Sequence, residues 1–177
     1  MMASLRMLRR RAMIGGPVLL ALPGCGFHPL YGGDGPEGGP ARSGLELIAV
    51  AIIPERVGQL LRQALQARFD HGDAPAAKRF DLAVQFGIGN EGLSVQHDNT
   101  TTRLRFIGQA SWTLTTRDAA RATVTSGSAR AVDGLNLFDQ QYFAQDLQTE
   151  TVQRRIAEAV ADQITSQLAM YFDRHPV

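Results

Sequence analysis

Apolar residues alternate strictly with small or polar residues from Phe80 to Ile88, and this period of two constrains the possible folds more than any other feature of the chain. The apolar set is Phe80, Leu82, Val84, Phe86 and Ile88, and between them lie Asp81, Ala83, Gln85 and Gly87. Because successive side chains of a strand point to opposite faces, the pattern predicts a strand with one buried face and one polar face.

Two later segments are predicted to form strands beside this one. The alternation returns in residues 104–114, with Trp112 on the apolar face, and a Thr- and Val-containing segment runs from Arg121 to about Val132. The short turn Asp118–Ala120 between the two segments favours a hairpin. Residues 89–102 are polar and have no period, so a loop is expected there.

Residues 45–53 form an apolar run rich in Ile and Val, which is typical of a buried strand. Helical spacing follows in residues 54–71, where Pro54 and Glu55 suit a first turn, and again in residues 140–172. The order strand, helix, three strands, helix predicts an α+β fold, a two-layer sandwich in which a four-stranded sheet packs against two helices. The opposite face of the sheet is then open to water or to a partner.

The 177 residues suffice for one domain or at most two, and their charges are distributed unevenly. Four of the 18 basic residues lie within the first eleven positions, whereas the first of the 17 acidic residues is Asp34. Without residues 1–24 the chain has 14 basic and 17 acidic side chains, a net charge of −3. A chain of this sign is not expected to bind nucleic acid, because phosphate binding requires a concentrated excess of Lys and Arg.

The first 24 residues have the features of a signal peptide. A basic start precedes an apolar run from Ala12 to Leu22, and these 11 residues are too few to span a bilayer, which takes roughly 20. The run ends in Leu22-Pro23-Gly24-Cys25, which resembles the lipobox of bacterial lipoproteins. That resemblance implies cleavage before Cys25, the only cysteine, and its modification with diacylglycerol and an N-acyl chain. Gly26 then favours the outer membrane.

A spacer follows the cysteine. Residues 32–40 contain five glycines, two prolines and two acidic residues, a composition that favours a flexible tether. We therefore expect a signal peptide over 1–24, a lipidated terminus and tether over 25–44, one domain over 45–172 and a short tail over 173–177.

No constellation of residues in the sequence indicates catalysis, a metal or a cofactor. Residues 87–92 match the dinucleotide pattern G-x-G-x-x-G, but no helical period follows them, so a glycine-rich strand end is favoured. The four histidines have no metal-ligand spacing, and Ser94, His97 and Asp98 lack the context of a catalytic triad. The chain is therefore not expected to be an enzyme.

Four arginines are candidate contacts for an anionic lipid head. Arg103, Arg105, Arg117 and Arg121 lie at the ends of the two predicted hairpin strands. Guanidinium groups bind phosphate bidentately, which suits this role. The alternative is an ordinary solvated hairpin with Asp118 as the counter-charge.

The stretch Cys-Gly-Phe-His-Pro-Leu-Tyr-Gly at positions 25–32 resembles the start of mature lipopolysaccharide-assembly lipoproteins of the LptE family. Weaker matches to the family occur at residues 53–56, 59–62, 154–157, 161–164, 168 and 171–172. The resemblance implies a non-enzymatic lipoprotein of the outer membrane, anchored on its periplasmic side. It also implies a place as a plug in the lumen of the β-barrel translocon LptD, where such proteins support barrel assembly and lipopolysaccharide delivery to the outer leaflet.

Two other functions remain possible on the sequence alone. An accessory lipoprotein of a lipid-transport ABC system would have a similar size and the same anchor, but would lack the motif at residues 25–32. A periplasmic lipoprotein enzyme is the second alternative.

Overall fold

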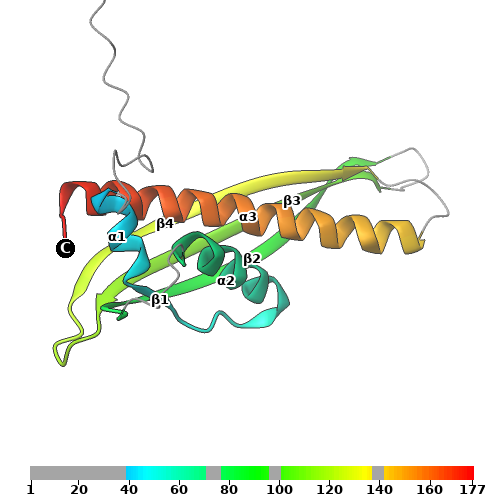
Figure 1. Cartoon of the computed structure of the whole chain (residues 1–177). Coiled ribbons are helices and arrows are strands. Elements are labelled where there is room, and N and C mark those ends of the chain that lie inside the picture. Colours follow the sequence, from blue (N-terminus) through cyan, green and yellow to red (C-terminus); the bar gives the residue numbers. More distant parts are fainter. Residues whose placement is uncertain (1–38, 71–76, 96–100, 137–141) are drawn as a thin grey trace, which may run out of the picture.

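The computed structural model describes residues 39–70, 77–95, 101–136 and 142–177, and these form a two-layer α+β sandwich. One layer is a four-stranded sheet, and the helices α2 and α3 lie together on one of its faces (Figure 1). The predicted fold class is confirmed. The structure adds one short helix, α1, before the first strand.

The sheet has the strand order β1-β2-β3-β4. The short strand β1 (Ile48–Val50) is parallel to β2 (Phe80–Val95), and helix α2 connects them. Strands β2, β3 (Thr101–Thr116) and β4 (Thr123–Asn136) form an antiparallel meander, so the predicted hairpin between β3 and β4 is confirmed. Neighbours along the chain are thus neighbours in the sheet.

The two long helices run in the same direction beside each other. Helix α2 is Glu55–Phe69 and helix α3 is Tyr142–Arg174. Arg56 pairs with Glu150, and Arg68 Nε lies 2.6 Å from Asp162 Oδ1. The partners are 94 positions apart in both ion pairs, as parallel helices require. At about 1.5 Å per residue, the 33 residues of α3 extend roughly 50 Å along the sheet. None of the described helices is both long and apolar enough to cross a membrane.

The core lies between the sheet and the helices, as the alternation predicts. Phe80, Leu82 and Val84 of β2 are buried, and Trp112 of β3 is 4% exposed. The indole Nε1 of Trp112 donates to Gln167 Oε1 of α3 at 3.2 Å, so the one polar atom of this side chain is satisfied. From α3 the core receives its apolar stripe, which includes Val152, Ile156, Val160, Ile164, Leu168 and Phe172.

Strands β2 and β3 are longer than the sequence pattern indicates. The loop expected over residues 89–102 is wrong in large part, because β2 continues to Val95 and β3 begins at Thr101. Pairing continues through Gly92 opposite Leu104, with register shifts on either side of Ser94. Backbone pairing with a neighbouring strand therefore extends β2 and β3 through residues that have no apolar alternation. The sequence prediction of these strands depended on that alternation alone.

The first described helix begins before the predicted boundary of the domain. Helix α1 covers Pro40–Glu46, whereas residues 40–44 were assigned to the tether and Leu45 to the first strand. A Cβ built on Gly44 would lie 2.3 Å from the ring of Phe172, so glycine allows α1 to pack directly on the end of α3. Ala41 and Leu45 are buried in this contact region. The strand predicted over 45–53 is correspondingly reduced to Ile48–Val50.

Candidate functional site

The face of the sheet that points away from the helices is the main candidate surface. It is lined by the odd-numbered residues of β2 and β3 and the even-numbered residues of β4, as the registers require. Exposed polar side chains on it include Gln85, Gln109, Ser111, Ser126, Ser128 and Arg130. None of the described helices covers this face (Figure 1). The open face that the sequence predicts is therefore present.

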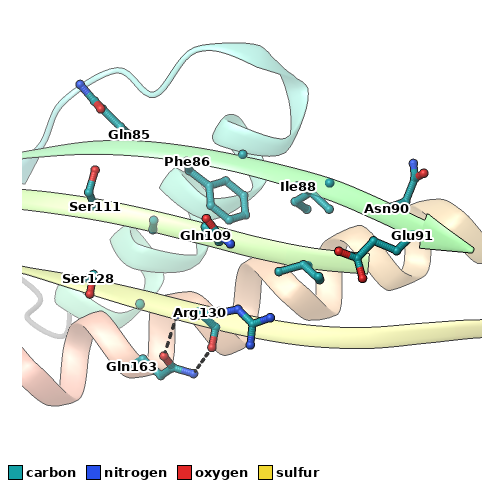
Figure 2. Close-up of a pocket in the computed structure, with 15 residues that line it drawn as sticks. Gln85, Phe86, Ile88, Asn90, Glu91, Gln109, Ser111, Ser128, Arg130 and Gln163 are labelled. Carbon is teal, nitrogen blue, oxygen red and sulfur yellow. Dashed lines mark hydrogen bonds between the residues drawn. The ribbon is translucent and has the colours of Figure 1, made fainter. Parts of the chain in front are cut away.

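A broad hollow of about 1200 Å³ lies along β2, β3 and β4 in the middle of the sheet (Figure 2). Gln85, Gln109, Ser111, Ser128 and Arg130 contribute its polar side chains. Phe86 and Ile88, which belong to the opposite side of β2, reach it at the strand edge. The surface offers hydrogen-bond donors and acceptors, with neither a nucleophile beside a base nor a paired set of acids.

Side chains of α3 cover the outer edge of β4 at this site. On β4, the side chain of Gln163 accepts from Arg130 N at 3.1 Å and donates to Arg130 O at 3.0 Å (Figure 2). Gln167 Nε2 donates to Ser128 O at 3.0 Å. These α3 amides replace the hydrogen bonds that a further strand would make. The sequence does not predict these roles, because the pattern of polar residues on a helix is the same whether a surface glutamine bonds to a strand or to water.

The four candidate arginines form two separate pairs. Arg103 and Arg105 lie near the start of β3, and Arg117 and Arg121 lie at the β3–β4 turn. The 12 residues from Arg105 to Arg117 span roughly 40 Å of extended strand. A single lipid head group therefore cannot contact all four side chains.

Arg103 and Arg105 line a hollow of about 360 Å³ together with Val132, Asp133 and Gly134. Arg105 Nη1 is 3.9 Å from Glu91 Oε2, and Asp133 pairs with Arg155 of α3 at 3.0 Å. Arg103 is exposed and has no ion-pair partner among the residues that the structure describes. Among the described residues, this end of the sheet thus offers one guanidinium outside any ion pair and one held only by a long ion pair.

At the turn, the side chain of Arg117 is held by a shorter ion pair than that of Arg105, whereas the printed contacts of Arg121 are those of its backbone N–H. Arg117 Nε is 3.1 Å from Asp81 Oδ1, and the backbone N–H of Arg121 donates to Asp118 Oδ1. The Thr116 hydroxyl donates to the same carboxylate at 2.7 Å, and this bond, with the N–H groups of Arg121 and Ala120, keeps the pKa of Asp118 below its usual 3.8. Asp118 therefore organises the turn through the Thr116 hydroxyl and two backbone N–H groups, and the counter-charge of Arg117 is Asp81.

The other sequence motifs do not form sites in the described residues. The G-x-G-x-x-G match at 87–92 lies inside β2, where no helix N-terminus is available for a pyrophosphate. His175 stacks on Tyr171 with ring centroids 4.4 Å apart. No group of three potential metal ligands occurs in the described ranges. Cys25, His28, His71, His97 and Asp98 lie outside the described residues.

Solved structures with the same fold come from bacteria. A Caulobacter crescentus CB15 protein superimposes with a TM-score of 0.59 at 22% identity, over 75% of this chain and 95% of that chain. Rare lipoprotein B from Shewanella oneidensis gives a TM-score of 0.51 at 11% identity, over 70% and 92% of the two chains. Lipoprotein B from Nitrosomonas europaea gives 0.50 at 15%, over 70% and 81%. At these identities the likeness establishes the fold.

The sequence itself identifies the family. No curated protein matches the chain closely enough to count as a relative. The family model for LptE, described as lipopolysaccharide-assembly, matches residues 45–168, which is well over half of the chain and contains most of the sheet and most of α3. The chain therefore belongs to the LptE family of lipopolysaccharide-assembly proteins.

Proposed function

We propose that this protein is a non-enzymatic lipoprotein of the outer membrane, and that it supports assembly of an LptD-like β-barrel translocon and delivery of lipopolysaccharide to the outer leaflet. The family match over residues 45–168 is the observation that carries this function. The same match favours lipopolysaccharide assembly over an accessory role in a lipid-transport ABC system.

The surface of the domain supports a place inside a barrel lumen. An elongated sandwich presents one face of β2–β4 that is polar and uncovered by any described helix. The interior of an outer-membrane barrel is polar, so such a face can contact its wall through hydrogen bonds. Lipid on Cys25 and the tether after it would hold the domain at the periplasmic side of the membrane, from which it enters the lumen.

Affinity purification from detergent extracts tests the partner. The full-length lipoprotein with a C-terminal tag should co-purify with a large β-barrel protein in a stable ratio. Recovery of inner-membrane permease components in its place would support the ABC alternative. Recovery of no barrel would contradict the proposal.

The Arg103 and Arg105 pair is the part of the site that we assign to lipopolysaccharide. Arg103→Glu with Arg105→Glu should weaken binding of purified lipopolysaccharide by about thirtyfold, because two charged contacts of roughly 1 kcal/mol each are lost. The matched control is Arg117→Glu with Arg121→Glu, which makes the same charge change at the other end of β3. Equal losses for both pairs would show that net charge alone governs binding.

A further inference from the structure

One long edge of the sheet has no partner strand among the described residues. Strand β1 pairs with β2 only from Phe80 to Leu82, whereas β2 continues to Val95. The last contact on this side is the bond from Ala51 N to Leu82 O at 3.0 Å. Beyond it, Val84–Asn90 is paired with β3 on one side and with no described strand or loop on the other.

The backbone groups that face this free edge can be identified. Phe80 N donates to Leu47 O, and Leu82 O accepts from Ala51 N, so even-numbered residues of β2 direct their N–H and C=O groups toward β1. The register with β3 is regular through Gly92. By the same alternation, Val84, Phe86, Ile88 and Asn90 present their backbone groups outward.

This edge lacks the features that normally prevent pairing. Residues 83–90 contain no charged residue and no proline, which are the usual protections of an exposed edge. The opposite edge, by contrast, is covered by the amides of Gln163 and Gln167. Phe86 and Ile88 are only partly buried, so the apolar layer is also incomplete on this side. A further strand would complete both the hydrogen bonds and the apolar layer.

Two glycines beside the edge indicate what kind of strand fits. A Cβ built on Gly87 or Gly89 meets no atom within 4 Å, whereas at Gly108 and Gly127 it would collide with Ile156 or Trp112. The chain's own packing therefore does not require Gly87 or Gly89, although glycine weakens a strand. Large side chains on a neighbouring strand can cover such edge glycines, and aromatic residues do so best.

A second copy of this chain fits the edge poorly. In the two-fold register that pairs the whole of Val84–Asn90 with itself, Gly87 faces Gly87, and no side chain covers it. The strands of a closed barrel are also unsuitable donors, because each is already paired on both sides. A suitable donor is an extended segment outside the barrel wall, with large side chains at alternate positions.

We propose that the free edge of β2 over Val84–Asn90 accepts an extended segment of the barrel partner as an added strand, with large side chains of that segment over Gly87 and Gly89. This inference rests on the proposed function for the identity of the partner. The added strand gains affinity from main-chain hydrogen bonds and specificity from alternate side chains.

Amide hydrogen exchange tests the added strand directly. The full-length lipoprotein is compared alone in detergent and in its complex with the barrel. In the complex, the amides of Val84, Phe86, Ile88 and Asn90 should exchange at least about tenfold more slowly. Those of Gln85 and Gly87, already paired with β3, should change little.

The alternative results separate this inference from the proposed function. An intact complex without slower exchange at the even-numbered amides would overturn the added strand and leave the barrel partnership standing. Slower exchange in the lipoprotein alone as its concentration rises would assign the edge to a second copy and overturn the inference. Failure to isolate any complex with a barrel would overturn both.

Substitution of the glycines supplies a second test. Gly87→Val and Gly89→Val add β-branched side chains into open space, so each variant alone should melt at the same or a higher temperature. Each should nevertheless reduce recovery of the barrel by about fivefold or more, because the added side chain occupies the space over the glycine that the large side chains of the incoming strand would fill. The control Ala122→Val places the same side chain at an exposed position just before β4, outside the candidate surface, and should leave recovery unchanged. Unchanged recovery with both glycine variants would overturn the inference.

Discussion

Single glycines set how closely the sheet and the helices approach. A Cβ built on Gly108 of β3 would lie 2.2 Å from Ile156 Cγ2 of α3, and one on Gly127 of β4 would lie 2.6 Å from the Trp112 ring. Ile156 and Trp112 are buried, so neither side chain can move freely to make room for an added methyl group. Glycine at these positions therefore reflects packing and not chain flexibility.

We predict that Gly108→Ala destabilises the protein by about 1–3 kcal/mol, since one methyl group must displace Ile156. Urea unfolding of the purified protein gives this difference directly. Gly87→Ala is the matched control, because its methyl group enters open space on the same sheet. A variant Gly108→Ala that is as stable as the wild type would show that α3 can shift at no cost.

At the scale of elements, helix α3 acts on the sheet in two ways. Its apolar stripe buries the inner face, and its glutamines at 163 and 167 occupy the free backbone groups of β4. The first role follows from helical periodicity in the sequence. The second depends on where α3 lies relative to the edge, which no local pattern specifies.

We expect the double variant Gln163→Ala and Gln167→Ala to lose about 1.5–4 kcal/mol of stability, because water replaces the exposed hydrogen bonds to β4 incompletely and the buried indole N–H of Trp112 loses its acceptor. It should also self-associate more readily, since the edge of β4 becomes available for pairing. Chemical unfolding and light scattering measure the two effects. Gln148→Ala, which changes an exposed glutamine of the same helix, should produce neither.

At the scale of the whole molecule, the proposed signal peptide would account for the uneven charges, and the proposed lipidation would account for the single cysteine. The basic residues of positions 1–24 belong to the proposed leader, and the remainder has a net charge of −3. Helix α1 includes residues 40–44, the last five residues of the proposed tether. On the proposed function, anchoring depends on lipid at Cys25.

We predict that Cys25→Ala shifts the protein from the membrane fraction to a form extracted by a urea or high-salt wash, and abolishes incorporation of labelled palmitate. Each buried methylene contributes about 0.8 kcal/mol to anchoring, so loss of the acyl chains removes most of the membrane affinity. Fractionation in cells with reduced barrel protein prevents the partner from retaining the variant. Membrane retention and labelling equal to the wild type would refute lipidation at Cys25.

The sequence alone determined the fold class, the buried faces of β2 and β3 and the family, because apolar periodicity and local motifs record which side chains avoid water. Tertiary structure decided the rest. It extended β2 and β3 through polar residues by backbone pairing, added α1 against Phe172, and separated the four arginines to opposite ends of β3. It also placed Gln163 and Gln167 on the edge of β4, while the edge of β2 beyond Leu82 has no partner among the described segments. These features depend on distances between segments far apart in the chain, and a linear pattern of residue types does not encode such distances.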